Sequence, residues 1–351
     1  MKIGLYSTAQ IPTAPKLKGY GGVEYTVGNL AKRFAKHGHE VHLFGAKGSY
    51  RPDGGVVNEF ESSNPNEAIL EREMFQSFDK SLFDDLDILH DNSHWHFPAA
   101  LVPDVQYCYT LHATRANMQD FKQGYNYNGI LQCTHHAIYQ KWMTGNEYRV
   151  CQGGIDISHF KFKKDKGDRL LWLSRLFEPK GAHRAIEIAE MAKTPIDIVG
   201  GSFIDTPSYT NKIKRMCQYS DYANFVGEVS QKEKHEYLEN AKALLFPVEQ
   251  FLSPASMGIS LWIEALCLVP LEALACGTPV IASPNGIISD AVHDGMTGYL
   301  AANDRDFVDR IHQIDNIDPQ MCRCRAEYFS LDKTAERYLH LYKEIIEGRT
   351  W

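Results

Sequence analysis

The chain has 351 residues, of which 44% are hydrophobic and 23% charged, and its formal net charge is -7 at pH 7. This length predicts two domains that each bury a core. The net negative charge does not indicate a surface that binds nucleic acid. No apolar run reaches the roughly 18 residues that span a bilayer, and no signal-peptide pattern opens the chain. We therefore expect a cytoplasmic protein without a nucleic-acid partner; contact with a membrane surface stays open, but nothing indicates it.

Eight cysteines are scattered through mostly apolar segments, and none of them forms a Cys-x-x-Cys pair. Neither a disulfide framework nor a structural zinc site is therefore implied. We expect the cysteines to be buried, reduced thiols, because free cysteine behaves as a small hydrophobic residue.

The first segment reads as strand, helix, strand, with strands over residues 2–7 and 40–45. The helix between them is predicted by apolar residues at helical spacing, namely Val23, Val27, Leu30, Ala31 and Phe34. A glycine-rich loop with Gly19, Gly21 and Gly22 precedes this helix, so its backbone can approach a ligand closely. This loop lacks the spacing of a dinucleotide fingerprint and the Lys-Ser/Thr of a P-loop, and taken alone it is as compatible with a plain turn.

A helix over residues 67–83 and strands over 87–90, 105–111 and 130–134 continue the alternation. This pattern favours a parallel sheet that is covered by helices on both faces. His112 directly follows a strand, at the end where such sheets bind ligands. The other histidines of this half have no spacing typical of metal ligands and are expected to be structural or exposed: His90, His94, His96, His135 and His136.

A polar, lysine-rich linker over residues 156–168 separates this half from a second strand and helix alternation. Strands are predicted over 170–173, 196–199, 224–226, 243–246 and 280–282, with helices over 181–192 and from the capping box of Ser230 and Glu233 to about residue 241. We expect domains over 1–158 and 159–328, and a C-terminal segment over 329–351. The segment holds a helix over 332–346 whose buried face carries Ala335, Tyr338, Leu339, Tyr342 and Ile346.

Glu264 and Glu272 stand eight positions apart beside a helix-like run that ends at Gly277. Proline fits the first turn of a helix, so Pro270 predicts a helix over about 269–276, with Glu264 before it and Glu272 inside it. The N–H groups of Leu268 and Val269 would be unpaired at the positive end of this helix, where phosphate binds well. Two acids flanking an anion site suggest a phosphorylated sugar donor.

Two cations follow the strand over 170–173 on a turn that opens into a helix. Arg175 and Lys180 there can neutralise a diphosphate, although an exposed basic turn explains such a pair equally well when it is taken alone. The stretch over 250–263, before Glu264, is predicted to be a long loop that forms a functional cover or an insertion.

At this point the sequence resembles the retaining glycosyltransferases of family 4, which have the GT-B fold of two Rossmann-like domains facing each other across a cleft. The resemblance rests on motifs in the same order along nearly the whole chain. They are Gly21-Gly22-Val23-Glu24, Thr110-Leu111-His112, Gly153-Gly154-Ile155-Asp156, Arg175 with Lys180-Gly181, Gly227, and the stretch from Glu264 to Val280. Two glutamates followed by Ala275-Cys276-Gly277-Thr278-Pro279 are the most specific of them.

The resemblance implies that Arg175 and Lys180 hold the diphosphate of a nucleoside-diphosphate sugar, a UDP- or GDP-sugar. The backbone of Leu268 and Val269 and the Gly21-Gly22 loop would help, and Glu272 would accept hydrogen bonds from the ribose. Glu264 would lie against the transferred sugar, and His112 would contact the sugar or the acceptor.

No metal is obligatory in the mechanism that this resemblance implies, since cations neutralise the leaving group. The final helix would cross back onto the first domain. Of the two Asp-x-Asp sequences, Asp85-Leu86-Asp87 precedes its strand and Asp304-Arg305-Asp306 resembles a helix start.

The sequence departs from the family pattern at four places. Cys267 and Ser174 stand where glycine is usual, Leu266 where phenylalanine is usual, and Cys151-Gln152 where proline-asparagine is usual. A side chain at Cys267 restricts how the backbone presents N–H groups to phosphate. Two alternatives to a transferase stay open. One is a GT-B phosphorylase or nucleotide-sugar epimerase, and the other, which Cys267 and the long loop motivate, is a nucleotide-sugar-binding protein without transfer activity. The base, the sugar and the acceptor are not indicated.

Overall fold

The computed structural model describes residues 1–15, 21–61, 64, 66–101, 104–112, 128–132, 137–138, 141, 145–201, 207–248, 252–255, 258–261, 264 and 267–351. The chain forms two compact units. The first comprises Met1–Gly154 with Leu331–Trp351, and the second comprises Ile155–Ser330. The sequence-based prediction placed the end of the first domain at residue 158 and the end of the second at residue 328.

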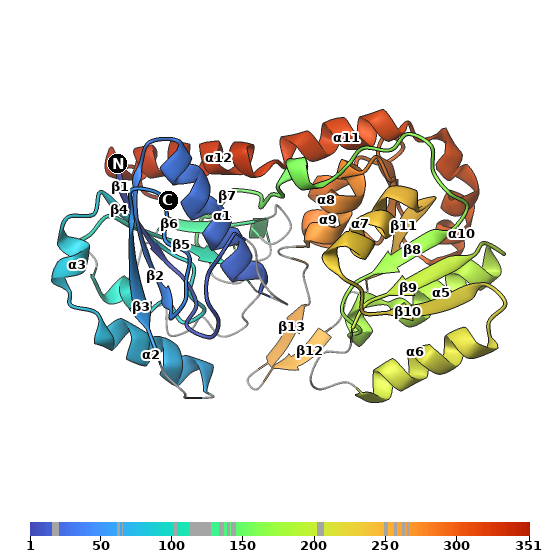
Figure 1. Ribbon diagram of the computed structural model, residues 1–351, viewed down its shortest axis with the longest axis horizontal. Helices are drawn as coiled ribbons and strands as arrows, with labels where there is room; N and C mark the ends of the chain where they lie inside the picture. The colour runs from blue at the N-terminus through green and yellow to red at the C-terminus, as the bar shows by residue number, and fades with distance from the viewer. Residues whose placement is uncertain are drawn as a thin grey trace. The chain divides into compact units, whose positions relative to one another are not determined.

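The first unit is built on a parallel sheet whose strand order is β3-β2-β1-β4-β5-β6-β7 (Figure 1). Its strands are β1 (Lys2–Tyr6), β2 (Glu40–Ala46), β3 (Val56–Phe60), β4 (Ile88–Asp91), β5 (Tyr107–Leu111), β6 (Asn128–Leu131) and β7 (Arg149–Val150). The central strands β1, β4 and β5 are buried almost throughout, which explains why their sequences do not alternate between apolar and polar residues.

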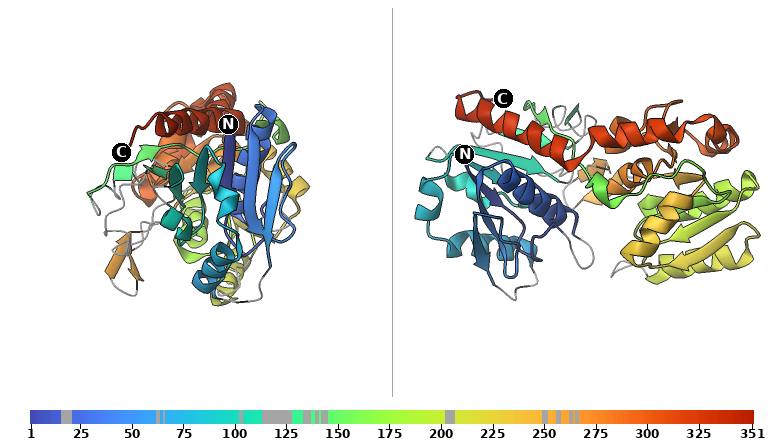
Figure 2. Two further views of the ribbon diagram at one scale, coloured as in Figure 1. Left: turned by 90° about the vertical axis from the view of Figure 1, so that its left-hand side faces the viewer. Right: turned by 45° about the horizontal axis from the view of Figure 1, so that its top comes forward.

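Helix α1 (Gly22–Lys36) and the C-terminal helix α12 (Leu331–Ile346) pack against each other and on this sheet, as both views of Figure 2 show. Val27, Leu30, Ala31 and Phe34 of the predicted stripe are fully buried. The ring of Phe34 meets that of Tyr342 edge to face, with 5.6 Å between their centroids. The predicted return of the final helix to the first domain is thereby confirmed.

Two helices of this unit differ from the prediction. The single helix expected over residues 67–83 is α2 (Glu67–Ser77) followed by the short α3 (Ser81–Asp84), because Phe78 is extended and Asp79 binds the N–H and hydroxyl of Ser81. On α12, Ile345 is buried, whereas Ile346 is 39% exposed. Ile345 continues the spacing of Tyr338 and Tyr342 along the helix, and Ile346 lies one position beyond that face.

The second unit has a parallel sheet of order β10-β9-β8-β11-β14-β15. Its strands are β8 (Leu170–Leu173), β9 (Ile196–Val199), β10 (Ala223–Gly227), β11 (Ala243–Phe246), β14 (Val280–Ala282) and β15 (Gly298–Leu300). Its helices are α5 (Ala182–Met191), α6 (Pro207–Tyr219), α7 (Gln231–Asn240), α8 (Leu268–Ala275), α9 (Ile287–Ala291), α10 (Asp304–Gln313) and α11 (Pro319–Tyr328). Both units thus confirm the Rossmann-like α/β class.

The stretch over 250–263 is not the plain loop that we expected. Strands β12 (Leu252–Ala255) and β13 (Gly258–Leu261) pair in antiparallel fashion, with Leu252 opposite Leu261 and Ala255 opposite Gly258. A hairpin satisfies the backbone groups of this segment internally.

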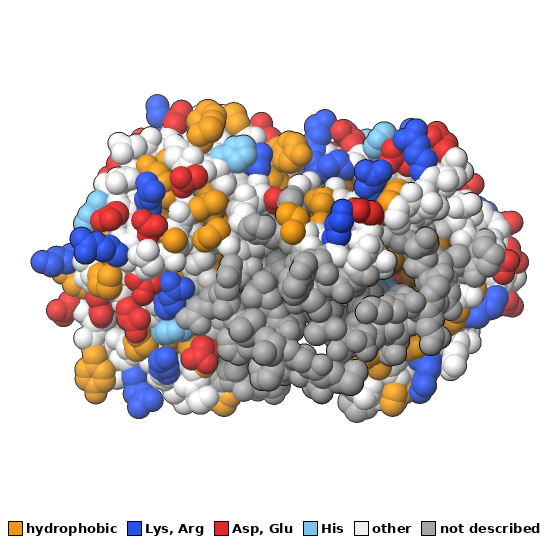
Figure 3. Space-filling model, turned by 180° about the vertical axis from the view of Figure 1, so that it is seen from behind, with side chains coloured by type: hydrophobic (Ala, Val, Ile, Leu, Met, Phe, Trp, Pro, Cys, Tyr) orange, Lys and Arg blue, Asp and Glu red, His pale blue; other side chains and the backbone are white. Residues whose placement is uncertain are grey.

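Cysteine burial and surface charge follow the composition. Cys108, Cys151, Cys217, Cys267, Cys276 and Cys322 are buried free thiols; Cys324 is exposed, contrary to expectation, and Cys133 lies outside the described residues. Acidic and basic side chains of the described residues are interspersed on the face shown in Figure 3. Among the described helices, none is long and apolar enough to cross a membrane.

Candidate nucleotide-sugar site

The carboxyl end of β8 is a natural ligand-binding position in the second unit. Strand β8 lies between β9 and β11, and the chain leaves it towards β9 through α5 before it returns on the other side as β11. Open parallel sheets bind ligands at such a point, because the loops on its two sides diverge and leave a crevice. Arg175 and Lys180 follow β8 directly.

A buried ion pair joins two of the predicted site residues. Lys180 and Glu264 are 84 positions apart in sequence, yet the Lys180 Nζ atom lies 2.5 Å from Oε1 of Glu264. The two residues are 8% and 3% exposed. The prediction that the basic turn and the first glutamate share one site is supported by this distance.

The backbone around Lys180 is held in place by its neighbours. Trp172 of β8 donates from its indole nitrogen to the carbonyl of Lys180 at 3.0 Å. Gly181 has a φ of +73°, and a Cβ atom there would lie 2.2 Å from the carbonyl oxygen of Pro247, just after β11. Only glycine therefore allows this close approach between the loops that follow β8 and β11.

Lys180 remains charged at this site. Burial is the largest single effect and lowers the pKa of Lys180, but the charge and hydrogen bond of Glu264, together with Cys267, outweigh it, so this pKa is raised above its usual value. An ammonium group in a largely water-free position is suited to neutralising a phosphate more strongly than one in solvent.

The backbone of Glu264 is fixed by the segment that begins α9. Its N–H donates to Oδ1 of Asn285 at 3.1 Å, and its carbonyl accepts from the N–H of Ile287 at 2.8 Å. Gly286, between them, has a φ of +58°, and a Cβ there would lie 2.2 Å from the Glu264 carbonyl oxygen. Sequence reasoning had not identified Asn285 as a partner of Glu264.

Arg175 is half-buried and leans over an aromatic ring. Its guanidinium carbon lies 5.1 Å from the centroid of Phe177, and the N–H of Phe177 donates to the Arg175 carbonyl at 2.9 Å. The charge of Arg175 also acts on Lys180. The two cations therefore belong to one electrostatic site.

Helix α8 begins at Leu268, one residue earlier than predicted, with Cys267 as its N-cap residue. The Cys267 side chain makes no capping hydrogen bond, although the N–H of Val269 acts on its thiol, and Leu268 and Val269 are only half-buried. Burial raises the pKa of Cys267 to about 12, although Lys180 opposes this. Cys267 is thus a neutral thiol beside the positive end of the helix.

Glu272 is paired with a residue that the sequence did not single out. Its Oε1 atom accepts from Lys234 Nζ of α7 at 2.7 Å. Glu272 is 7% exposed, and its Oε2 atom is buried without a hydrogen-bond partner among the described residues. A buried carboxylate oxygen without a donor is costly, and a ligand hydroxyl would satisfy it.

Gly21, Gly22 and His112 belong to the first unit. Gly21 is the N-cap residue of α1, and a Cβ at Gly22 would meet no atom within 4 Å; Gly19 of the same loop lies outside the described residues. His112 Nε2 lies 3.1 Å from Oδ1 of Asn92, which follows β4. Burial lowers the pKa of His112 well below its usual value, with added effects from His94, His90 and His96, so the imidazole is neutral.

One cluster in the first unit has the composition of a metal site. Ligand atoms of Glu67, Glu71 and His94 lie within 4.8 Å of one another. However, both carboxylate oxygens of Glu71 accept backbone N–H groups, from His94 at 3.0 Å and from Trp95 at 2.8 Å. His94 also contacts Glu67 directly. These contacts give Glu71 a role in holding the loop after β4.

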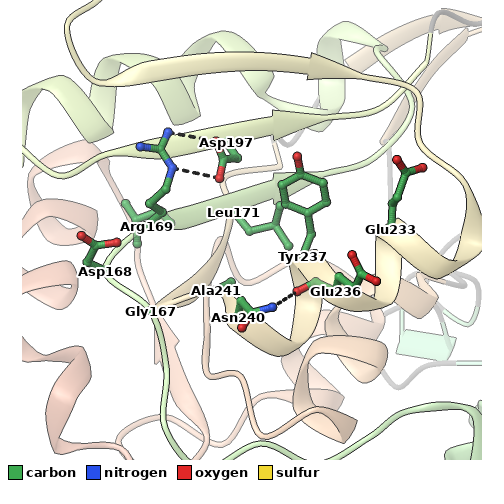
Figure 4. Close-up of a pocket in the computed structure, with 11 residues that line it drawn as sticks. Gly167, Asp168, Arg169, Leu171, Asp197, Glu233, Glu236, Tyr237, Asn240 and Ala241 are labelled. Atoms are coloured by element: carbon green, nitrogen blue, oxygen red, sulfur yellow. Dashed lines mark hydrogen bonds and ion pairs between the residues drawn. The ribbon is translucent and has the colours of Figure 1, made fainter.

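A pocket of about 440 Å³ lies at the opposite end of β8 from Arg175 (Figure 4). It is lined by the amino ends of β8 and β9 and by one face of α7, which contributes Glu233, Glu236 and Tyr237. Arg169 and Asp197 form a bidentate ion pair on one wall of it. Its position at the amino edge of the sheet separates this pocket from the candidate site.

Two family models match consecutive parts of the chain. "Glycosyltransferase Family 4" matches residues 20–148, and "Glycosyl transferases group 1" matches residues 155–327. A D-inositol 3-phosphate glycosyltransferase of Streptomyces bingchenggensis is 29% identical over 165 residues, which are 44% of this chain and 33% of the relative. The matched segment thus spans only about a third of this relative's own length.

Solved structures resemble the chain over nearly its full length. AviGT4, described as a glycosyltransferase involved in avilamycin A biosynthesis, has a TM-score of 0.73 at 23% identity, covering 100% of this chain and 99% of its own. Anabaena HepE, solved in complex with UDP and glucose, has a TM-score of 0.71 at 14% identity, covering 98% and 100%. At these identities the likeness shows the fold alone.

Proposed function

We propose that this protein, which belongs to the group 1 glycosyltransferases of family 4, transfers a sugar from a nucleoside-diphosphate sugar to an acceptor hydroxyl with retention at the anomeric carbon. The donor is a UDP- or GDP-sugar, and no metal is obligatory. The solved complex of the similar HepE with UDP and glucose supports a UDP donor.

The observation that carries this proposal is the buried pair of Lys180 and Glu264 at the carboxyl end of β8. A buried lysine beside an arginine and the positive end of a helix forms an anion site with three different kinds of positive charge. A fold-stabilising ion pair alone would not require the second cation beside it.

In the proposed reaction, the acceptor oxygen bonds to the anomeric carbon while the bond from that carbon to the diphosphate oxygen breaks. The proton of the acceptor hydroxyl passes to the departing diphosphate oxygen. Negative charge grows on that oxygen, and Arg175 and Lys180 with the N–H groups of Leu268 and Val269 stabilise it. Lys180 then shares its charge between Glu264 and the phosphate.

Three further residues contact the donor in this proposal. Glu264 lies against the transferred sugar, and the free Oε2 atom of Glu272 accepts a hydrogen bond from a ribose hydroxyl. The neutral imidazole of His112 offers a hydrogen bond to a sugar hydroxyl without adding charge. At the start of α1, Gly21 is the N-cap residue and the open space around Gly22 leaves room for a ligand.

A panel of UDP-, GDP- and ADP-sugars, each measured by thermal shift and by donor hydrolysis, tests the function directly. One donor should raise the melting temperature and be hydrolysed slowly in the absence of an acceptor. Binding without any hydrolysis or transfer to a panel of hydroxyl acceptors would favour the alternative of a nucleotide-sugar-binding protein, which the Cys267 side chain motivates. Failure of every donor to bind would contradict the proposal.

Glu272→Gln should weaken binding of the nucleoside diphosphate about tenfold, because a neutral amide is a poorer acceptor for a ribose hydroxyl than a carboxylate. Isothermal titration calorimetry measures the change. Glu187→Gln, an exposed site on α5, is the control for the loss of one negative charge. Equal affinities of the two variants would exclude the ribose contact.

A further inference from the structure

The Lys234–Glu272 pair is the feature of the site that neither motif nor family pattern assigned. Lys234 lies on α7, which packs against α8 (Figure 1). Leu238, four positions further along α7, is fully buried, so the two side chains share the face that meets α8. The opposite face, with Glu233, Glu236 and Tyr237, lines the pocket of Figure 4.

We infer that Lys234 is a positioning residue for the donor site: it binds one oxygen of Glu272 and so leaves the other available to the ribose. The inference rests on the proposed ribose contact of Glu272. It adds the reason why a carboxylate that is 7% exposed can remain an acceptor.

The two carboxylate oxygens of Glu272 have different surroundings. Oε1 is occupied by Lys234 Nζ at 2.7 Å, whereas Oε2 is buried and unpartnered among the described residues. A carboxyl group that is buried without a cation takes up a proton and becomes a donor as well as an acceptor. The side chain of Lys234 is itself only 20% exposed, so solvent screens this pair less than a surface ion pair.

The other titratable groups that act on Glu272, or are acted on by it, do not replace Lys234. Burial lowers the pKa of His235, the next residue of α7, and Lys234 lowers it further, so this imidazole is neutral at pH 7. On and beside α8, burial raises the pKa of Cys267 and of Cys276 to about 12, so both thiols are neutral. Among the described residues of α7 and α8, Lys234 is therefore the cation that contacts Glu272.

The test compares three lysine variants of the full chain, with UDP or GDP as the probe, by calorimetry between pH 6 and pH 8.5. Lys234→Met keeps the length of the side chain and removes its charge. Lys234→Arg keeps the charge. Lys232→Met removes a charge two positions away on α7, where Lys232 is 87% exposed in its side chain and pairs only loosely with Glu236, at 3.8 Å.

Lys234→Met should bind the nucleoside diphosphate at least tenfold more weakly than the parent at pH 6. This deficit should shrink as the pH rises, because a buried carboxyl group that has lost its cation gives up its proton less readily. It should also discriminate less between the ribonucleotide and its 2′,3′-dideoxy analogue. Lys234→Arg should restore most of the affinity, and Lys232→Met should match the parent. A merely structural role for Lys234 would not move the pH profile or the ribose discrimination.

Parent-like affinity and pH dependence in Lys234→Met would overturn the inference. If Glu272→Gln is weakened while Lys234→Met is not, the ribose contact survives and only the role of Lys234 fails. If the parent binds neither nucleotide, the proposed function fails first, so the two failures are distinguishable.

Discussion

At the scale of single residues, the site depends on how the backbone of Glu264 is held. Asn285 and Ile287 bond its two backbone groups, and Gly286 packs directly against its carbonyl oxygen. Because the side chain of Glu264 reaches Lys180 only from this backbone position, the turn before α9 determines where the carboxylate lies.

Gly286→Ala should therefore lower the transfer rate by roughly 100-fold, since a displacement of about 1 Å costs that much in a positioned site. The added Cβ meets the Glu264 backbone at 2.2 Å, and the φ of +58° is unfavourable for alanine. Gly295→Ala is the matched control, because Gly295 also has a positive φ, +74°, but open space around its Cβ. Transfer rates are measured with the donor that binds. Equal rates for the two variants would show that the contact of Gly286 with the Glu264 backbone is not what positions the carboxylate.

At the scale of elements, α12 is held to the first unit by a buried polar network as well as by packing. His90 of β4 lies with Nδ1 2.6 Å from the hydroxyl of Tyr342 and with Nε2 2.7 Å from the hydroxyl of Thr110. Burial lowers the pKa of His90 to about 3. The sequence placed His90 among the structural or exposed histidines, and it is structural.

This burial predicts a pH dependence of stability. The unfolded chain protonates His90 below about pH 6.5, whereas the folded chain does so only near pH 3, so its contribution is fully present above pH 6.5 and is lost as the pH falls. The slope is roughly 1.4 kcal/mol per pH unit within that window.

His90→Gln, which cannot titrate, should flatten the pH dependence of the free energy of unfolding between pH 6 and pH 4, as measured by urea denaturation. The variant should also be less stable at pH 7 by about 1–3 kcal/mol, because polar partners lose their bonds. His340→Gln, at a site on α12 that is 74% exposed in its side chain, should leave the slope unchanged. A parent-like slope in His90→Gln would contradict the assignment.

At the scale of the whole molecule, two units of the same Rossmann-like class divide the predicted site residues between them. Arg175, Lys180, Glu264 and Glu272 lie in the second unit, and His112 lies in the first. The second unit alone holds the cations that are proposed to neutralise the donor diphosphate.

Transfer activity should therefore persist in EDTA, because Arg175 and Lys180 supply the positive charge that a metal ion supplies in other enzymes. The measurement is the turnover of the donor that binds, before and after chelation and after addition of Mg²⁺ or Mn²⁺. Lys180→Met should, by contrast, lose activity that no metal restores. A complete, metal-reversible loss of turnover in the parent protein would contradict the metal-free mechanism.

Much of the architecture follows from local sequence. Strands β8, β9, β11 and β14 begin and end where predicted, because each is a short apolar run that is buried on both faces and bounded by polar or turn residues. Strands β3 and β15 were not predicted: β3 is an edge strand that keeps several exposed positions, and β15 has only three residues.

Only part of the candidate site could be predicted from the sequence in this way. The sequence by itself determined its family, its glutamates and its basic turn, because residue type and spacing along one segment carry that information. Only the tertiary structure decided that Lys180 pairs with Glu264 and that Lys234 pairs with Glu272, across 84 and 38 positions. Such pairs depend on which strands lie side by side and which helix faces meet, and no periodicity within one segment encodes that.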